Sequence, residues 1–515
     1  MRIDGGELAG PVRIEEILAR GLADRSDAPA LVSRVDAWTW REFDAASARA
    51  ANRLADLGLR PGDRLASLVP NRTSLIVLYL ACLRAGVVAV PLNYRYTSAQ
   101  IDHALAVCGA SALVHHAERD ADIAASTQAG RLPFGVISFE ADDDRPLTLE
   151  SILRDGDAAF TPPDLPDDAP AIVFFTSGST GEPKGVVHSR RSIGWVFAAK
   201  AANLKATPDD TLLVSTSASH MSGATMPMAF FSAGATVAVA RVLDADEILP
   251  LVREHRPTLL QMLPAALFAL VRDDHATRDD FASFRYCGSG GDTVPHELVR
   301  VVKEKTGLDI HEGYGMTEFG VSHANLPGRV NKLGSIGTVF DGYAMSVRDK
   351  DGREIDVGED GQMWVKTQAA MSGYWDRPQA TAEVFVDGWI DTGDIVSVDV
   401  DGYAWYRGRK KQLIIHDGSN ISPKEIEDAL LEHPAVELAG VVGVHDLVHG
   451  ENVYAYVSLV PGSGKVTGQQ LVQFTRERVG YKAPEHVVFL DEMPLNAAGK
   501  VDRATLKEMA AQGGC

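Results

Sequence analysis

A short run from Thr176 to Gly185 combines side chains that suit a triphosphate, with the sequence TSGSTGEPKG. Hydroxyls and backbone N–H groups donate hydrogen bonds to phosphate oxygens, glycine lets the backbone approach closely, and lysine offsets negative charge. The run is not a Walker A loop, because Lys184 precedes Gly185 rather than Ser or Thr and the glycine spacing differs. A flexible surface linker is the alternative interpretation. The apolar segment 171–175 leads directly into the run and favours a phosphate-binding loop.

Two later segments offer groups for the rest of a nucleotide. Thr317 and Glu318 supply a hydroxyl and a hard oxygen ligand, suited to a phosphate and to a Mg²⁺ ion bridging it. Asp394 follows a strand-like run and a glycine turn, where a carboxylate can accept hydrogen bonds from both ribose hydroxyls. Taken singly, each segment is also typical of an exposed helix start or an ordinary turn.

With these motifs in order along essentially the whole chain, the sequence resembles the adenylate-forming superfamily. This superfamily contains acyl- and aryl-CoA synthetases, non-ribosomal adenylation domains and luciferases, and the chain is most similar to the acyl-CoA synthetases. The motifs that support the resemblance are segments 176–185, 314–318, 389–394 and 496–500, together with Arg409.

The resemblance implies an ATP site and a set of catalytic residues. The implied ATP-binding residues are Thr176, Ser177, Gly178, Ser179, Thr180, Gly181, Lys184, Gly290, Gly291, Asp292, Tyr314, Gly315, Met316, Thr317, Asp394, Arg409 and Lys500. The implied catalytic residues are His220, Thr317, Glu318 and Lys500, with Glu318 as the Mg²⁺ ligand. Lys500 would enter the site during adenylation, because a cation bridging the α-phosphate and the leaving pyrophosphate lowers the barrier. Without the resemblance, Lys500 would be interpreted as an exposed loop lysine.

The resemblance also places the acid substrate beside His220, Met221, Gly290 and Gly315. Amino-acid-activating relatives carry an aspartate just after the residue matched by His220, whereas this chain has Met221 and Ser222. An unpaired substrate ammonium in an apolar pocket would be costly. A plain carboxylic acid is therefore the expected substrate, and its identity stays open between aryl, medium-chain and alicyclic acids.

Two positions are assigned to the second half of the reaction by the same resemblance. Lys411 matches the hinge about which the C-terminal domain turns, and Gly418 lies in the loop that borders the CoA tunnel. The chain departs from the family pattern at Gln412, where an acidic residue is common, and at Asp417, where the loop usually has paired glycines.

Composition narrows the class of protein. The 515 residues include 50 basic and 70 acidic side chains, a formal charge of −20, which argues against wrapping nucleic acid. The four cysteines, Cys82, Cys108, Cys287 and Cys515, show no metal-binding or disulfide spacing, which indicates a reduced, cytoplasmic compartment. The apolar stretch 75–92 is interrupted by Arg84 and Gly86, so we expect a buried helix and strand rather than a membrane span.

The predicted fold class is α/β, with a large N-terminal body and a small, mobile α+β C-terminal domain. Alternating helices and strands up to about residue 325 indicate largely parallel sheets. Asp-Gly pairs at 351–352, 360–361 and 401–402 predict type I′ hairpins in an antiparallel subdomain at 330–408. We place the domain boundary between residues 409 and 410, so that residues 410–515 form the C-terminal domain. Its first helix is expected to begin with a capping box at Ser422 and Glu425.

The predicted activity is ATP-dependent ligation of a carboxylic acid to CoA through an acyl-adenylate, with ATP, Mg²⁺ and CoA as cofactors. The expected partners are a small carboxylic acid and CoA or a carrier protein, and the protein is expected to be a monomer or homodimer. An acyl-AMP ligase that loads carrier-protein phosphopantetheine is the nearest alternative. A luciferase-like monooxygenase and a non-catalytic nucleotide-binding regulator are further alternatives.

Overall fold

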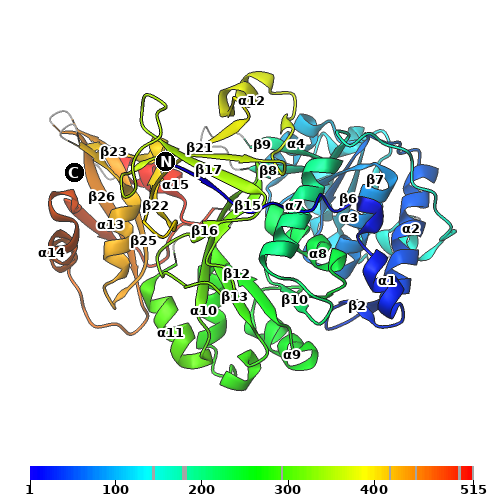
Figure 1. Ribbon diagram of the computed structural model, residues 1–515, viewed down its shortest axis with the longest axis horizontal. Coiled ribbons are helices and arrows are strands. Elements are labelled where there is room, and N and C mark those ends of the chain that lie inside the picture. The colour runs from blue at the N-terminus through cyan, green and yellow to red at the C-terminus, as the bar shows by residue number, and fades with distance from the viewer. Residues whose placement is uncertain are drawn as a thin grey trace.

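The computed structural model describes residues 1–141, 145, 147–176, 183–291, 294–416, 419–446, 449–496 and 500–512. In this described part the strands form four sheets. Figure 1 shows the N-terminal helices and strands at one end of the molecule and the C-terminal unit at the other, with the antiparallel strands β17 and β21 above the middle. The first strand of the chain lies on β17, so residues far apart in sequence close this central region.

One sheet of the body has seven strands in the described part, in the order β19-β9-β8-β5-β4-β6-β7. The strands from β8 to β7 are parallel, whereas β9 is antiparallel to β8 and to β19. Residues of β8 alternate between two separate apolar cores, so both faces of the sheet are covered. Its strands are β4 (Arg64–Leu68), β5 (Val88–Pro91), β6 (Ala112–His116), β7 (Val136–Phe139), β8 (Pro170–Thr176), β9 (Lys184–Ser189) and β19 (Gly373–Tyr374).

A second sheet has nine strands in the described part, in the order β16-β15-β14-β13-β12-β10-β11-β2-β3. The strands from β2 to β14 are parallel to their neighbours, and the strands at both ends are antiparallel. They are β2 (Pro29–Val32), β3 (Ala37–Thr39), β10 (Thr211–Val214), β11 (Thr236–Val239), β12 (Leu259–Met262), β13 (Tyr286–Gly290), β14 (Ile310–Met316), β15 (Gly320–Ala324) and β16 (Thr338–Val339).

Helices fill the space between these two sheets and cover their outer faces. The shared core contains α2 (Trp40–Asp56), α3 (Thr73–Ala85), α7 (Arg190–Asn203) and α8 (Met221–Ser232). The outer faces are covered by α4 (Ser98–Cys108), α5 (Asp120–Ala125), α9 (Ala245–His255), α10 (Pro264–Arg272) and α11 (His296–Thr306). The other helices of the body are α1 (Ala19–Arg25), α6 (Leu149–Arg154) and α12 (Pro378–Val384), with 3-10 turns η1 (Ile14–Glu16), η2 (Ala117–Arg119), η3 (Ala129–Arg131) and η4 (Arg278–Phe281).

The predicted antiparallel subdomain is present, although two of its strands join other sheets. It contains β1 (Arg2–Asp4), β17 (Tyr343–Arg348), β18 (Gly361–Thr367), β20 (Phe385–Val386), β21 (Trp389–Val398) and β22 (Ala404–Arg409). β16 extends the nine-stranded sheet, and β19 pairs with β9 of the seven-stranded sheet. The pairing of β19 with β9 brings the subdomain against the hairpin of β8 and β9, which carries the predicted phosphate loop.

The type I′ turns predicted at three Asp-Gly pairs are wrong. Gly352 and Gly402 have positive φ, but the aspartates before them do not, and Gly361 lies at the start of β18. Asp349 and Asp399 accept backbone N–H bonds within these turns and replace the expected geometry. The pair with positive φ at both residues is Asp387-Gly388, between β20 and β21.

The C-terminal unit is an α+β layer whose sheet has five strands in the described part. The strands are β23 (Ile414–His416), β24 (Ser419–Ile421), β25 (Val436–Asp446), β26 (Gly450–Leu459) and β27 (His486–Phe489). The helices α13 (Pro423–Leu431) and α14 (Gly468–Val479) pack with one apolar core and α15 (Arg503–Gln512) with another, while η5 (Lys410–Gln412) and η6 (Gly480–Lys482) are short turns. The predicted fold class is thereby confirmed, whereas the boundary at residue 410 and the mobility of this unit stay predictions.

The predicted capping box of α13 is wrong. Ser422 is the N-cap and Pro423 opens the helix, but the Ser422 side chain makes no cap hydrogen bond. Its hydroxyl donates instead to the carbonyl of Arg407, two residues before the end of β22. Ser422 therefore ties the start of α13 to the end of the antiparallel subdomain.

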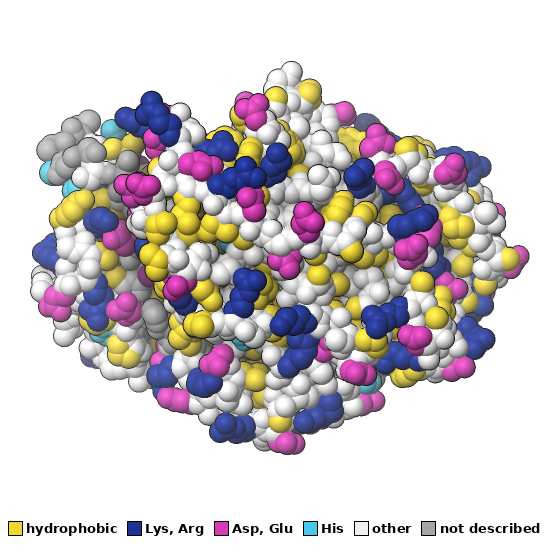
Figure 2. Space-filling view, in the orientation of Figure 1, with side chains coloured by type: hydrophobic (Ala, Val, Ile, Leu, Met, Phe, Trp, Pro, Cys, Tyr) yellow, Lys and Arg dark blue, Asp and Glu magenta, His cyan; other side chains and the backbone are white. Residues whose placement is uncertain are grey.

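Three further features of the structure concern the sequence predictions about a membrane span, the surface charge and the cysteines. No described helix is long and apolar enough to span a membrane. On the face seen in Figure 2, basic and acidic side chains are intermixed rather than gathered into one patch. Cys82, Cys108 and Cys287 are buried free thiols, and burial raises the pKa of each thiol to about 12.

Candidate active site

The predicted phosphate loop connects two paired strands. Thr176, at the end of β8, lies opposite Lys184, at the start of β9. The intervening Ser177, Gly178, Ser179, Thr180 and Gly181 lie outside the described residues, as do Asp292 and Gly418. The hairpin therefore fixes the two ends of the loop, and the roles of its inner residues stay predictions.

Tyr374 links this hairpin to the predicted Mg²⁺ ligand. The Lys184 ammonium lies over the Tyr374 ring, 5.0 Å from its centroid, and the Tyr374 hydroxyl donates to Glu318 Oε1 over 2.8 Å. One aromatic side chain thus contacts both a cation suited to phosphate and a carboxylate suited to a metal. Sequence analysis missed Tyr374, and its only signal was an aromatic residue in the glycine-containing run GYW at 373–375.

Backbone hydrogen bonds hold Tyr374 in this place. Trp375 N–H donates to the carbonyl of Gly185 over 2.8 Å, and Met371 N–H donates to the carbonyl of Glu318 over 2.7 Å. β19 therefore bridges the phosphate-loop hairpin and the turn after β14. Long-range pairing of this kind leaves no local pattern in the sequence.

Asp394 is the centre of a second polar cluster. Its carboxylate, whose side chain is 1% exposed, accepts hydrogen bonds from the hydroxyls of Tyr314 and Tyr406 and from Arg409 Nε over 3.1 Å. The pairing of β21 with β22 places Asp394 opposite Arg409, while Tyr314 comes from β14 of the neighbouring sheet. The structure thus brings together three predicted residues from separate motifs and adds Tyr406.

Burial dominates the electrostatics of this carboxylate. Loss of solvent raises the pKa of Asp394, and the charge of Arg409 and the hydrogen bonds from Tyr314, Arg409 and Tyr406 offset only part of the rise. The Arg409 side chain remains 42% exposed. A charged pair with one partner open to solvent is suited to receive a polar ligand.

Two predicted glycines lie where backbones approach closely. A Cβ on Gly290 would be 2.6 Å from the carbonyl oxygen of Gly313, and one on Gly315 would be 2.4 Å from that of Gly320. Gly291, after Gly290, has a φ of +82°. These positions need glycine for the fold itself, so their presence is not by itself evidence of ligand contact.

The neighbouring Met316 and Thr317 end β14 and start the turn that leads to Glu318. The Thr317 carbonyl is 2.8 Å from His188 Nε2, and the buried Glu318 accepts the bond from Tyr374. Burial lowers the pKa of His188 to about 4, so this histidine is a neutral support for the turn.

His220 of the body and Lys500 of the C-terminal unit lie close enough to interact electrostatically. His220 caps α8 and is followed by the buried Met221. Burial lowers the pKa of His220, and the nearby charge of Lys500 lowers it further. Lys500 N–H donates to Asn496 Oδ1 over 3.2 Å, and Asn496 N–H donates to the Lys500 carbonyl, which closes a tight loop. The structure thus places Lys500 within electrostatic reach of His220, and the role of Lys500 in catalysis stays a prediction.

Glu312 is a second residue that sequence analysis missed. It lies on β14, accepts the Gly334 N–H over 2.7 Å, and has its pKa raised to about 7 by burial. Lys424 and Asp428 of α13 act on it electrostatically. Its position two residues before Tyr314 was the available signal.

Lys411, the predicted hinge, is exposed within η5, and its role stays a prediction.

Glu318 is the described group that best fits a hard divalent cation. Among the described residues there is no cluster of three or more acidic, histidine or cysteine side chains that could form a complete metal cage. Mg²⁺ usually takes one or two carboxylates and completes its shell with water and substrate phosphates. The single carboxylate of Glu318 beside the phosphate-loop hairpin fits that donor set.

Comparisons with known proteins agree with this arrangement. Residues 18–375 match the AMP-binding enzyme family, and residues 425–500 match the AMP-binding enzyme C-terminal domain. The chain is 36% identical over 475 residues to feruloyl-CoA synthase of Amycolatopsis sp, covering 90% of this chain and 92% of that protein. It is 30% identical to the fatty acid–[acyl-carrier-protein] ligase ScoC of Streptomyces coeruleorubidus, covering 93% of each chain.

A solved structure extends the likeness to three dimensions. ATP-bound MatB from Rhodopseudomonas palustris matches with a TM-score of 0.89 and 29% identity, covering 97% of this chain and 99% of that one. The family match spans more than half of the chain. The chain belongs to the AMP-binding enzyme family.

Proposed function

We propose that the protein is an acid–thiol ligase that converts a carboxylic acid, ATP and CoA into acyl-CoA, AMP and pyrophosphate. The observation on which the proposal rests is that Lys500 of the C-terminal unit is near enough to His220 to affect it electrostatically, in a chain whose body holds Asp394, Arg409 and the phosphate-loop hairpin. A protein that only bound a nucleotide would not need a cation from a distant loop at the acid site.

In the first half-reaction, a carboxylate oxygen of the acid forms a bond to the α-phosphorus of ATP. The bond between the α-phosphorus and the bridging oxygen breaks, and pyrophosphate leaves with its electron pair. Lys500 would stabilise negative charge on the α-phosphate and the leaving group, while Asp394 and Arg409 would hold the ribose. His220 would orient the acid carboxylate, and Lys184 would offset charge on the phosphates.

Glu318 would hold Mg²⁺, with Thr317 beside it. Bound there, the ion would neutralise charge on the phosphate oxygens. Tyr374, by donating to Glu318 and contacting Lys184, would keep the carboxylate and the ammonium in fixed positions. These roles rest on donor chemistry and on the distances within the site.

In the second half-reaction, the thiol sulfur of CoA bonds to the acyl carbon, AMP leaves, and the thiol proton is released. The first half supplies the good leaving group that a free carboxylate lacks. The C-terminal unit would turn about Lys411 between the halves, so that a different face, including Gly418, meets the thiol. The likeness to feruloyl-CoA synthase supports CoA as acceptor.

The first test is a panel of aryl, aliphatic and alicyclic acids assayed for pyrophosphate release with and without CoA. The second test is Lys500→Ala. We expect it to lose acyl-AMP formation about 10²- to 10³-fold, yet to convert supplied acyl-AMP and CoA to thioester at nearly the wild-type rate. Equal loss of both half-reactions would contradict the assigned role of Lys500.

A carrier-protein acceptor is the second candidate function, favoured by the likeness to ScoC. Both candidates share the first half-reaction, so they differ only in the thiol. Supplying CoA and a holo-carrier protein in parallel separates them. A monomer or homodimer state and a cytoplasmic location are further proposals, to be checked by sedimentation and by fractionation of cells.

A further inference from the structure

Lys200 is a buried amine that the mechanism above does not use. It lies on α7, one turn from its end, and is 1% exposed. Lysine is rarely buried without a carboxylate partner, because removing an ammonium from water is costly. No ion pair joins Lys200 to an acidic residue in the part of the chain that the structure describes, so its burial needs another explanation.

Hydrogen bonding satisfies only part of this amine. Lys200 Nζ donates to Thr225 Oγ1 over 2.5 Å, and the Thr225 hydroxyl in turn donates to the carbonyl of Met221. An ammonium has three N–H donors and a neutral amine has two. Thr225 is the only partner of Nζ among the described residues. Burial lowers the pKa of Lys200 to about 7, so the group remains a donor in both of its protonation states at neutral pH.

The position of Nζ points to the acid site. Helical side chains lean toward the N-terminus of their own helix, so Lys200 leans toward Val196 and Thr225 leans toward Met221. Val196 and Met221 meet at Gly320, since a Cβ on that glycine would lie 3.3 Å from Val196 Cγ1 and 3.7 Å from Met221 Cε. Nζ is therefore held near the first turn of α8, which begins after His220.

A second polar group on the same turn of α8 is also unsatisfied. Ser222 Oγ is buried and has no hydrogen-bond partner among the described residues. Ser222 and Thr225 are three residues apart and thus share one side of α8. Lys200, bonded to Thr225, and Ser222 thus both have unused hydrogen-bonding capacity at the first two turns of α8 after His220, which indicates that a polar ligand group completes them.

We propose that Lys200 hydrogen-bonds an oxygen on the tail of the acid substrate, so that acids with a tail oxygen are preferred to hydrocarbon acids of the same length. This preference rests on the proposed ligase activity, because the acid must enter with its carboxylate at His220. A phenol, a ketone and a second carboxylate share the required acceptor. A site built to hydrogen-bond a substrate oxygen rejects the analogue that lacks it, because the site's own polar groups then stay unpaired.

The test compares matched acids with wild-type protein and variants. The pairs are 4-hydroxycinnamate with cinnamate and hexanedioate with hexanoate, which separate a phenol from a carboxylate as the preferred tail group. The measurement is kcat/KM for pyrophosphate release, together with the affinity of each acid for the ATP-bound protein. We expect at least one oxygenated acid to be favoured about tenfold or more over its partner.

Lys200→Met removes the amine and keeps an unbranched apolar side chain of similar size. We expect it to lose that preference by reducing kcat/KM for the oxygenated acid, with little change for the hydrocarbon acid. Lys305→Met, on the exposed side of α11, is the matched control and should keep the wild-type preference. If K200M does not fold, Thr225→Val replaces it in the test. We expect Thr225→Val to reduce the preference for the oxygenated acid by about threefold or more.

Three outcomes would overturn the proposal. A wild-type preference below about tenfold in both pairs, or a preference that K200M retains, would overturn this proposal alone. Absence of pyrophosphate release with every acid of the wider panel would overturn the proposed function and this proposal together.

Discussion

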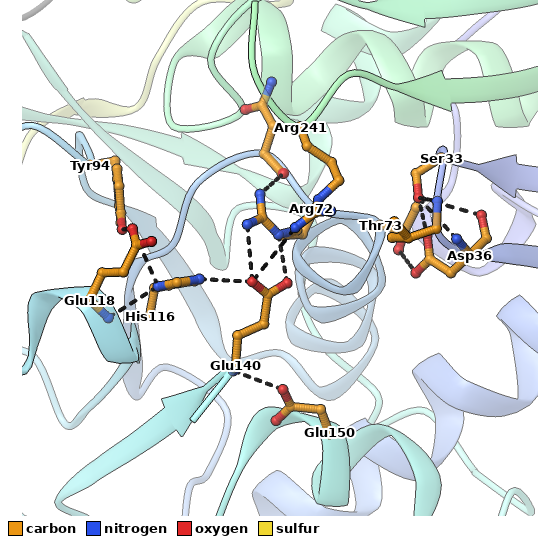
Figure 3. A network of polar contacts seen from close by, with 12 residues as sticks. Ser33, Asp36, Arg72, Thr73, Tyr94, His116, Glu118, Glu140, Glu150 and Arg241 are labelled. Carbon is orange, nitrogen blue, oxygen red and sulfur yellow. Dashed lines mark hydrogen bonds and ion pairs between the residues drawn. The ribbon is translucent and has the colours of Figure 1, made fainter. Parts of the chain in front are cut away.

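Two carboxylates, the partly exposed Glu140 and the buried Asp394, show how similar contacts produce different electrostatics. Glu140 follows β7 at the carboxyl edge of the seven-stranded sheet (Figure 3). Arg72 donates to its two oxygens over 2.7 and 3.0 Å, and His116 Nε2 lies 2.8 Å from Oε2. Burial alone would raise the pKa of Glu140, but Arg72 and His116 outweigh it and hold the pKa at about 2.

At Asp394 the balance is reversed. Its donors are two tyrosine hydroxyls and one Arg409 nitrogen, and the net effect of burial is a raised pKa. The ionised form of Glu140 is thus stabilised by Arg72 and His116, whereas Asp394 holds a costly negative charge that its partners only partly stabilise. The difference fits the proposed roles, in which the Glu140 cluster stabilises the fold and the Asp394 cluster receives a ligand.

Asp394→Asn should give the largest effect on activity. The amide cannot accept as strongly from two ribose hydroxyls, so we expect kcat/KM for ATP to fall about 10²- to 10³-fold in acid-dependent pyrophosphate release. The free energy of unfolding should change by less than about 1 kcal/mol, because relief of the buried charge offsets the loss of the bond from the solvated Arg409. A large loss of stability with little loss of activity would reverse the roles of the two clusters.

Tyr374→Phe should give the next largest effect, since it removes the hydroxyl that donates to Glu318 and keeps the ring that contacts Lys184. Loss of such outer contacts typically weakens metal binding by about tenfold or more. We expect the Mg²⁺ concentration for half-maximal activity to rise by about that factor. Tyr94→Phe, which removes a hydroxyl that donates to Glu118 near the Glu140 cluster, is the control and should leave the Mg²⁺ dependence unchanged.

Glu140→Gln should have the opposite profile to Asp394→Asn. It replaces a carboxylate that accepts from Arg72 and His116 by a neutral amide, so the free energy of unfolding should fall by about 1 to 2 kcal/mol. Activity per folded molecule should stay within about twofold of the wild type, because no predicted site residue contacts Glu140. Denaturant titration and pyrophosphate release measure the two quantities on the same sample.

The pH dependence of the stability lost in E140Q tests whether the ionised Glu140 carboxylate stabilises the fold. The pKa of Glu140 is lowered from 4.5 to about 2, so the folded state stabilises its ionised form. Its contribution to stability is complete above about pH 4.5 and is lost as the pH falls through about 2. The stability difference between wild type and E140Q should therefore shrink across this window. A difference that grows on acidification would contradict the ion-pair explanation.

Sequence patterns predicted more of the Asp394 cluster than of the Glu140 cluster, and the reasons are physical. Asp394 and Arg409 stood in motifs, and the α/β pattern predicted the sheets around them. Tyr374 was missed because its role depends on β19 pairing with β9, a contact between strands almost two hundred residues apart. Glu140 was missed because its partners come from the ends of separate strands, and its φ of +50° has no signature in a glutamate. Local patterns identify elements, whereas the partners of a buried charge follow from the topology.

Arg241→Gln should give the smallest effect on stability, and it tests whether Arg241 belongs to the Glu140 cluster. Arg241 Nη2 is 3.9 Å from Glu140 Oε2, and its Nε is buried without a hydrogen-bond partner among the described residues. If Arg72 and His116 already satisfy the carboxylate, the more distant Arg241 adds little. The free energy of unfolding should then change by less than about 0.5 kcal/mol in denaturant titration. A cost equal to that of E140Q would mean that Glu140 links the two large sheets through Arg241, because Arg241 follows β11 of the other sheet.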